Sequence, residues 1–358
     1  MEEYAQIVDK VRGALLGGAV GDALGWPIEF QSLAQIRSEY GPAGVTGFLA
    51  GRPVPHRITD DTQMTLFTAE GLLRCPAGVD PVPSLRRAYL RWLDTQYQSG
   101  PGAAPDGWLA AQHFLYDVRA PGNACMGGLR QQRKGFETPV PLGEPGTVNS
   151  NSKGCGTVMR SAPFGLAGFG PDIAFTASAR ASQLTHGHPT GYLAAGAFAA
   201  LLDRILGGLD LRTALSQTIT QLSRIPSSEQ TVAALETALR LADSTEPSAE
   251  AVEQVGAGWI AEECLAIAVY CALQAEETKD VRAALMLSVN HSGDSDSTGA
   301  VAGNLLGAIH GLTALPLDWV ADIEGRDVIL QVADDLVINF GYRDRSRLAD
   351  RYPFDTEA

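Results

Sequence analysis

Apolar residues recur every three or four positions along most of the chain, which is the spacing of the buried face of an α-helix. This pattern predicts helices over 85–93, 175–184, 193–206, 211–222, 232–241, 260–273, 281–289 and 328–340, and a further helix around Leu72 and Leu73. Alternating runs rich in Val, Ile, Thr and Tyr are missing, so we expect few strands. The pattern therefore predicts an all-α fold, a compact helical bundle.

Two stretches rich in Pro and Gly interrupt the helical pattern, at 98–107 and 137–146. Either could join two domains, and a length of 358 residues would allow two. Helical segments of similar composition continue on both sides of each stretch, so we interpret both as surface loops. We expect a single domain over 1–358, with its core at about 9–340 and a solvated, charged tail at 341–358.

Eight glycines form two regular series with a spacing of four residues. They are Gly13, Gly17, Gly21 and Gly25, and Gly299, Gly303, Gly307 and Gly311. Residues four apart lie on one face of a helix, so each series makes a smooth stripe that another backbone can approach closely. Because a Gly inside a helix costs about 0.5–1 kcal/mol relative to Ala, each stripe needs a compensating contact. We expect two central helices packed closely together.

Charge and composition exclude several classes of protein. The 27 Lys and Arg against 41 Asp and Glu give a net charge of −14, which repels phosphate backbones and argues against a nucleic-acid scaffold. No apolar run approaches the roughly 18 residues of a membrane span, and Met1-Glu2-Glu3 is not the basic start of a signal peptide. Five Cys without a Cys-x-x-Cys pair indicate neither a disulfide framework nor a zinc site. We therefore expect a cytoplasmic monomer that does not enter a membrane.

Two acidic clusters precede helical segments. The first, Thr59-Asp60-Asp61-Thr62, offers four oxygen-bearing side chains where a helix N-cap needs one, although capping alone could explain it. The second lies within Asn290–Gly299, where Asp294 and Asp296 are alternate residues of a turn and can point the same way. Carboxylate and hydroxyl oxygens without Cys suit a hard cation, Mg²⁺ or Mn²⁺. Each cluster is a weak signal by itself.

The two clusters gain meaning only if they meet in space. Two carboxylates about 4 Å apart repel by about 4 kcal/mol at an effective dielectric near 20. Four converging carboxylates would need protons or cations, and two divalent ions are the usual solution. Sequence spacing leaves open whether they converge.

Two further segments carry candidate chemistry. Gly154 and Gly156 lie among small polar residues ahead of a helix, where backbone N–H groups can bind phosphate. Lys153 precedes the first Gly, so the segment is not a P-loop. Cys155 could be a nucleophile, but no paired base is evident. His186 and His188 could bind a metal, although such a pair is more often structural or a ligand contact.

Five segments together closely resemble the ADP-ribosylglycohydrolase family, which includes the dinitrogenase-reductase-activating glycohydrolases. They are 13–29, Thr59–Thr62, Ser152–Arg160, Thr185-His186 and Gly293–Gly299. Each motif alone is weak, but all five stand in the order and spacing of the family. The resemblance implies an all-α, single-domain fold with a binuclear Mg²⁺ centre, or sometimes Mn²⁺, at the base of a cleft.

The resemblance also implies roles for matching residues. Glu29 matches an acidic residue that gates the metals or acts as a base in some members, and Glu29 and Asp61 are the candidate catalytic carboxylates. Ser297 stands where the family usually has Thr, which keeps the hydroxyl but loses the methyl group that fixes its rotamer. The implied metal ligands are Thr59, Asp60, Asp61, Asp294, Asp296 and Ser297. The implied substrate-binding residues are Asn123, Ser152, Lys153, Gly154, Cys155, Gly156, Thr157 and His186.

The implied activity is hydrolysis of the glycosidic bond between ADP-ribose and a modified acceptor, with protein arginine as the expected acceptor. Serine, O-acetyl-ADP-ribose, nucleobase and guanidine adducts are alternatives. The ions would bind the hydroxyls of the distal ribose, and a carboxylate would assist cleavage through an oxocarbenium-like state. A non-catalytic ADP-ribose-binding relative should lack some of the acids. A two-metal phosphatase or nuclease would share the acids but leave residues 152–156 without a role.

Overall fold

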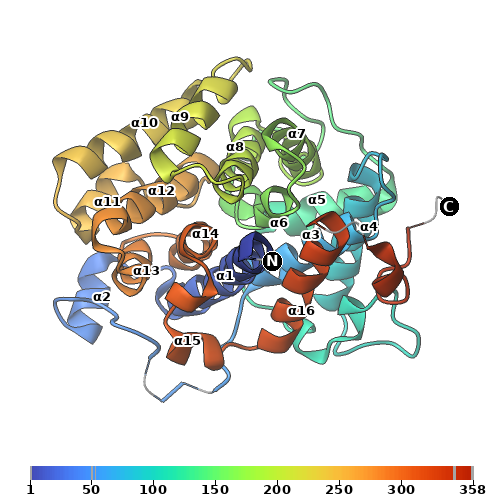
Figure 1. The fold of residues 1–358 in the computed structure, drawn as a ribbon, viewed down its shortest axis with the longest axis horizontal. Helices are drawn as coiled ribbons and strands as arrows, with labels where there is room; N and C mark the ends of the chain where they lie inside the picture. Colours follow the sequence, from blue (N-terminus) through green and yellow to red (C-terminus); the bar gives the residue numbers. More distant parts are fainter. Residues whose placement is uncertain (1, 50, 53, 342–343, 356–358) are drawn as a thin grey trace.

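Helices form nearly all the regular structure of the computed structural model, which describes residues 2–49, 51–52, 54–341 and 344–355 (Figure 1). Within this part of the chain, only two isolated β-bridges occur outside the helices. The predicted all-α fold is therefore confirmed. The α-helices are α1 (Glu2–Gly25), α2 (Leu33–Tyr40), α3 (Asp60–Leu73), α4 (Val82–Thr95), α5 (Asn123–Lys134), α6 (Ala162–Leu166), α7 (Pro171–Ser182), α8 (Pro189–Leu206), α9 (Leu211–Leu222), α10 (Glu229–Ser244), α11 (Ala249–Val255), α12 (Ala261–Thr278), α13 (Val281–Val289), α14 (Ser295–His310), α15 (Leu317–Ala321) and α16 (Arg326–Leu336).

The observed helices match the predicted stretches with differences at their ends. Helix α7 stops at Ser182, two residues before the predicted end, and the helix predicted over 328–340 changes at Val337 into a π-helical turn. Helices α2, α5, α6, α11 and α15 were not predicted, because short helices offer few repeats of the apolar spacing. The capping box of Ser32 and Gln35 fixes the start of α2, whereas α5 begins without a side-chain cap.

Helices α1 and α14 lie side by side at the centre of the molecule (Figure 1). Their glycine stripes face each other, and a Cβ added to Gly21 would lie 1.9 Å from the carbonyl oxygen of Gly299. Gly17 and Gly303 meet in the same way. The close packing predicted from the glycine series is therefore confirmed. The two helices run antiparallel, so the C-terminal end of α1 lies against the first turn of α14.

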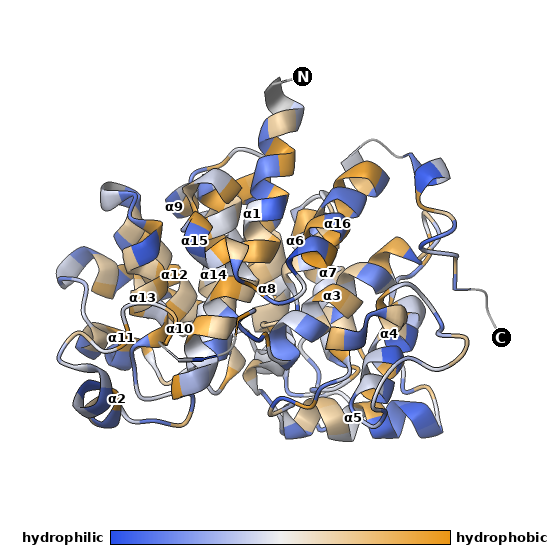
Figure 2. Ribbon diagram, turned by 90° about the horizontal axis from the view of Figure 1, so that it is seen from below, coloured by the Kyte–Doolittle hydropathy of each residue, from blue (hydrophilic) through white to orange (hydrophobic). Residues whose placement is uncertain are grey.

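The core around this pair is built largely from small residues. Helices α8 and α12 contribute long buried faces rich in Ala, and Cys264 and Cys271 of α12 are fully buried. All five cysteines are free, as the sequence indicated. Figure 2 shows hydrophobic positions distributed over most of the helices, while the first turns of α1 extend beyond the body. Among the described residues, no helix combines the length and apolar content that a membrane span requires.

The tail predicted to be solvated is instead packed against the body over residues 344–355. Leu348 and Tyr352 are buried, and the Tyr352 hydroxyl donates to Asp335 at 2.8 Å. Asp355 forms an ion pair with Arg74 at 2.9 Å. The expectation of a solvated tail is wrong here because apolar anchors lie between the charged residues. Residues 342, 343 and 356–358 of this tail lie outside the described residues.

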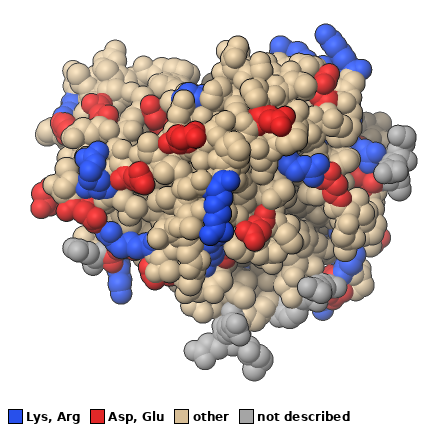
Figure 3. Space-filling model, turned by 90° about the horizontal axis from the view of Figure 1, so that it is seen from above, with Lys and Arg blue, Asp and Glu red and all other residues tan. Residues whose placement is uncertain are grey.

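The two Pro- and Gly-rich stretches are loops, as predicted. The first follows α4, and the second connects α5 to the segment that holds Gly154. Basic and acidic side chains are interspersed over the face shown in Figure 3.

Candidate active site

Five carboxylates meet where the end of α1 reaches the N-termini of α3 and α14. Asp60 and Asp61 form the first turn of α3, Asp294 and Asp296 flank the start of α14, and Glu29 follows the short helical turn after α1. Ligand oxygens of Glu29, Asp294 and Asp296 lie within 4.8 Å of one another. The four aspartates are buried and Glu29 is partly exposed. Asp61 also lies close enough to Asp294 and Asp296 for their charges to interact, so the two sequence clusters converge, and we call these five residues the acidic centre.

A sixth carboxylate, that of the buried Asp22, holds the acidic centre in place. It accepts the backbone N–H of Thr59 at 2.9 Å and that of Thr62 at 3.2 Å, and the Thr62 hydroxyl at 2.5 Å. The Thr59 hydroxyl accepts from Asp61 N–H and so caps α3, as the simpler interpretation of that motif required. Asp22 was not predicted as a site residue, although it lies within the first family motif. Its position on the glycine-rich face of a buried helix was the available signal.

Burial and mutual repulsion favour the protonated form of these carboxyl groups. Burial, with a smaller effect of Asp294 and Asp60, raises the pKa of Glu29 to about 8. Burial also raises the pKa of Asp60 to about 8 and that of Asp22 to about 6. The pKa of Asp61 lies well above its ordinary value because of burial and the neighbouring Asp60 charge. Such a cluster is stable near neutral pH only if protons or cations neutralise it.

The donor set of the acidic centre fits hard divalent cations. Its side chains offer carboxylate oxygens, with the Thr59 and Ser297 hydroxyls beside them, and Mg²⁺ and Mn²⁺ prefer such ligands. Asp61 Oδ2 is buried and has no hydrogen-bond partner, although a buried carboxylate oxygen is normally satisfied. Asn123 begins α5 close by, since the N–H of the preceding Gly122 donates to Asp60 at 3.3 Å. The unsatisfied Asp61 oxygen is what a bound cation would explain.

The glycine loop, Ser152–Thr157, lies directly against the acidic centre. The Cys155 thiol contacts Asp294 Oδ2 at 2.7 Å, and the Ser297 hydroxyl lies 3.6 Å from the same sulfur. Burial and the Asp294 charge raise the pKa of the Cys155 thiol well above its ordinary value. A protonated thiol is a poor nucleophile, so this geometry does not favour covalent catalysis by Cys155.

Other members of the glycine loop are already bonded within the protein. Lys153 Nζ contacts Glu262 and donates to Gln230 at 2.7 Å, so its charge is directed away from the loop. The Thr157 hydroxyl donates to the carbonyl of Gly191 at 2.7 Å, and Ser152 N–H donates to Asn149. These residues hold the shape of the loop.

His186 lies buried under the two glycines of the loop. A Cβ added to Gly156 would lie 3.4 Å from His186 Nε2, which is close to Gly154 as well. The other ring nitrogen, Nδ1, bonds to the Thr185 hydroxyl at 2.7 Å, and the buried Arg160 donates to the same hydroxyl at 2.6 Å. Burial, with a smaller effect of Arg160, lowers the pKa of His186 to about 3. His186 is therefore neutral near neutral pH. His188 instead accepts from Thr190 N–H and caps α8.

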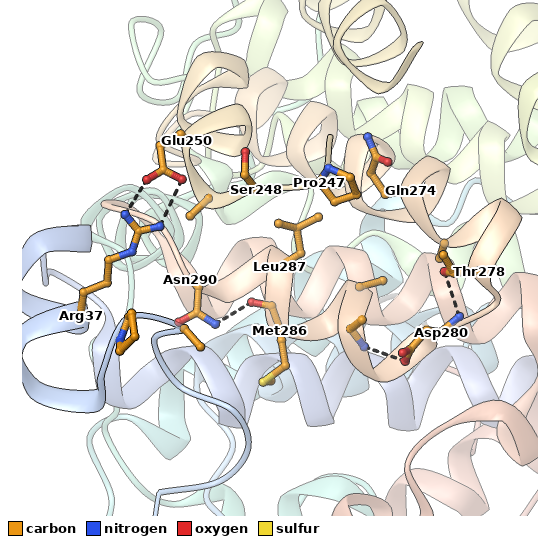
Figure 4. Close-up of a pocket in the computed structure, with 16 residues that line it drawn as sticks. Arg37, Pro247, Ser248, Glu250, Gln274, Thr278, Asp280, Met286, Leu287 and Asn290 are labelled. Carbon is orange, nitrogen blue, oxygen red and sulfur yellow. Dashed lines mark hydrogen bonds and ion pairs between the residues drawn. The ribbon is translucent and has the colours of Figure 1, made fainter. Parts of the chain in front are cut away.

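Two clefts lie near these elements. A polar cleft of about 460 Å³ adjoins the glycine loop and includes Ser150, Asn151, His188, Thr190 and Gln230 in its lining. A separate cleft of about 370 Å³ lies between α2, α11, α12 and α13 (Figure 4). The Arg37–Glu250 ion pair closes one end of the second cleft, and the acidic centre does not line it. Residues 152–157 and the acidic centre do not line the first cleft either, but its residues His188 and Gln230 are hydrogen-bonded to Ser152 and Lys153 of the glycine loop.

The fold and the site define an all-α protein with an acidic centre beside a glycine-rich loop. The ADP-ribosylglycohydrolase family matches residues 3–345, and the chain belongs to this family of enzymes, which hydrolyse ADP-ribose adducts.

Individual relatives are similar to this chain over most of their length. The ADP-ribosyl-[dinitrogen reductase] glycohydrolase of Rhodospirillum rubrum is 28% identical over 88% of this chain and 90% of its own. The ADP-ribosylarginine hydrolase Tri1 of Pseudomonas putida is 25% identical over 92% of this chain and 78% of its own. A solved structure, the "ADP-ribosylglycohydrolase-related protein complex", matches the fold with a TM-score of 0.64 at 24% identity, covering 93% of this chain and 98% of that one.

Proposed function

We propose that this protein hydrolyses the N-glycosidic bond between ADP-ribose and an arginine side chain of a modified protein, with two Mg²⁺ ions as cofactors and Mn²⁺ as an alternative. The observation that carries the proposal is the convergence of the acidic centre beside the glycine loop. Two relatives named ADP-ribosylarginine hydrolase favour arginine over serine as the acceptor.

Most residues of the acidic centre, together with two neighbouring hydroxyl groups, would bind the cations in this proposal. Thr59, Asp60, Asp61, Asp294, Asp296 and Ser297 would hold the two cations. Bound cations would supply Lewis-acid polarisation and would orient the hydroxyls of the distal ribose. Asp22 keeps Thr59 and the first turn of α3 in position by accepting three hydrogen bonds, one from Thr59 and two from Thr62.

Glu29 is the preferred candidate for proton transfer. It is partly exposed, whereas Asp61 is only 3% exposed, so a water molecule can reach Glu29 more easily. A carboxylate beside the anomeric carbon would take a proton from the attacking water as the oxocarbenium-like state forms. Asp61 is then chiefly a ligand.

ADP-ribose would lie across the glycine loop with its adenosine end in the polar cleft. Backbone N–H groups of the loop, with the neutral ring of His186 beneath them, would bind the diphosphate without a fixed positive charge. The cleft of about 460 Å³ adjoins the loop on the side where Ser152 and His188 are hydrogen-bonded. Local dipoles and bound cations thereby overcome a net charge of −14, which salt largely screens.

The chain would act as one domain, as a monomer, in the cytoplasm. Support for one domain comes from α1, which packs against both α14 and α16 from the far end of the sequence. Five free cysteines support a reducing compartment.

A panel of adducts tests the proposed activity. Purified protein is given ADP-ribosyl-arginine, ADP-ribosyl-serine, O-acetyl-ADP-ribose and a nucleobase adduct, with Mg²⁺ or with EDTA. We expect release of ADP-ribose from the arginine adduct that depends on Mg²⁺. ADP-ribose binding without release from any adduct would favour a non-catalytic relative, and phosphate release from a simple ester would favour a phosphatase.

A further inference from the structure

Two exposed aromatic side chains stack against each other at the rim of the acidic centre. The rings of Phe30 and Trp259 are 5.2 Å apart between centroids and inclined by 22°. Phe30 is 71% exposed and Trp259 is 39% exposed, so their stacking leaves most of Phe30 in contact with solvent. Neither side chain contributes much to the core. We call these two residues the aromatic pair.

The backbone of Phe30 has a positive φ angle, and its exposed side chain makes no core contact that would explain this strain. Gln31 N–H donates to the Ile28 carbonyl at 3.0 Å, which closes a turn with Glu29 at φ −50°, ψ 142° and Phe30 at φ 67°. These angles are those of a type II turn, whose third position favours Gly. A bulky residue with positive φ at an exposed position is a signature of functional sites.

The partner ring is attached to the other side of the acidic centre. The Trp259 carbonyl accepts Cys155 N–H at 3.1 Å, and the Ala257 carbonyl accepts Asp294 N–H at 2.9 Å. Phe30 directly follows Glu29. The aromatic pair therefore joins the residue after Glu29 to the segment that is hydrogen-bonded to the glycine loop and to Asp294.

We propose that the aromatic pair is the docking face for the guanidinium group of the acceptor. This inference rests on the proposed function. Aromatic faces attract planar cations, and guanidinium stacks on them readily. Acidic side chains also lie close by, because Phe30 directly follows Glu29, whose ligand oxygens lie within 4.8 Å of those of Asp294 and Asp296. Lys153, the basic residue of the glycine loop, is bound to Glu262 and Gln230 and does not compete.

Substitutions that separate acceptor binding from ADP-ribose binding test this assignment. Phe30→Gly removes the ring and relieves the turn, and Trp259→Ala removes the other ring. We expect each to lower kcat/KM on an ADP-ribosyl-arginine peptide by about tenfold. Turnover of O-acetyl-ADP-ribose, whose acceptor carries no cation, and the Kd of free ADP-ribose should change by less than about twofold. Phe30→Gly should be at least as heat-stable as the wild type, because Gly fits the turn.

A second experiment measures binding of a guanidine directly and does not depend on catalytic activity. Agmatine, a small guanidine, is titrated by calorimetry into the protein saturated with ADP-ribose and Mg²⁺. The wild type should bind it about tenfold more tightly than either variant, and Phe354→Ala, an exposed aromatic of the tail, should match the wild type. Equal agmatine binding by all proteins would overturn the assignment, even if no adduct is cleaved. Weaker ADP-ribose binding by both variants would instead assign the aromatic pair to the adenine base.

Discussion

The Asp22 carboxylate accepts the backbone N–H of Thr59 at 2.9 Å, so helix α1 fixes the turn at which α3 begins. This contact links the glycine-packed centre of the fold to the acidic centre. Close packing of α1 on α14 brings Asp22 and Glu29 to the N-termini of two helices whose first turns carry aspartates. The positions of the carboxylates are thus set by the helix pairing.

Asp22→Asn should weaken Mg²⁺ binding by about 10–100-fold, because a residue that orients metal ligands is lost as a strong acceptor. Calorimetric titration of Mg²⁺ measures this directly. The matched control is Asp203→Asn, which alters a buried acid that accepts Gly170 N–H at 3.0 Å on another helix. Equal Mg²⁺ affinity in the Asp22 variant and the wild type would show that Asp22 does not position the site.

Gly21→Ala should destabilise the fold by roughly 1–3 kcal/mol, because the new Cβ would lie 1.9 Å from the Gly299 oxygen and the helices must separate. Urea unfolding gives the change. Gly127→Ala in α5 is the control, since nothing lies within 4 Å of its added Cβ. This control should be neutral or up to about 1 kcal/mol more stable. A Gly21 variant as stable as the wild type would refute the close-packing account.

His291 should make folding sensitive to acid. Its pKa is lowered to about 4, chiefly by burial, so the folded protein keeps it neutral while the unfolded chain binds a proton below about pH 6.5. The stability that this group contributes is complete above pH 6.5 and falls as the pH drops toward 4. The loss should approach about 1.4 kcal/mol per pH unit.

His291→Gln isolates that contribution. The wild type and the variant are unfolded in urea at pH 7, 6 and 5, and the difference between their unfolding free energies is plotted against pH. Contributions of the acidic centre cancel in this difference. A constant difference across the three pH values would contradict the assignment.

The glycine loop should bind ADP-ribose through its backbone and His186 more than through Lys153. Lys153→Met should raise the Kd of ADP-ribose by less than about threefold, because Lys153 is already paired with Glu262 and Gln230. His186→Ala removes the buried polar ring that lies against Gly154 and Gly156 and should raise the Kd by about tenfold. Calorimetric titration of ADP-ribose into both variants measures the two Kd values. A larger increase in Kd for Lys153→Met than for His186→Ala would assign diphosphate binding to the Lys153 charge.

Helical periodicity and the glycine spacing predicted the architecture because each reflects local geometry. The glycine series predicted the α1–α14 pair correctly, since a four-residue stripe has meaning only when a backbone packs on it. Helix α2 was missed because its eight residues offer few repeats of the apolar spacing, and its start is fixed by a capping box instead. The tail was misjudged because its charges hid two buried anchors, Leu348 and Tyr352.

The candidate site was predictable as a set of motifs but not as an arrangement. Spacing along the chain could not reveal that Asp60 and Asp294 converge, because their approach depends on the pairing of helices far apart in sequence. For the same reason, Asp22 and the aromatic pair could not be recognised as site residues from the sequence. Phe30 in particular has no sequence signal, since its strain arises from the backbone angles of a turn that normally takes Gly.

The most direct test of the account is ADP-ribose release from ADP-ribosyl-arginine by the wild type, Asp60→Asn and Asp294→Asn, each with saturating Mg²⁺ and with EDTA. Thermal melts of the three proteins, run in parallel, confirm that each is folded. We predict Mg²⁺-dependent release by the wild type and at least about 100-fold slower release by both variants, because a lost metal ligand removes charge stabilisation at the reacting ribose. Full turnover by either folded variant, or by the wild type in EDTA, would contradict a cation-dependent acidic centre.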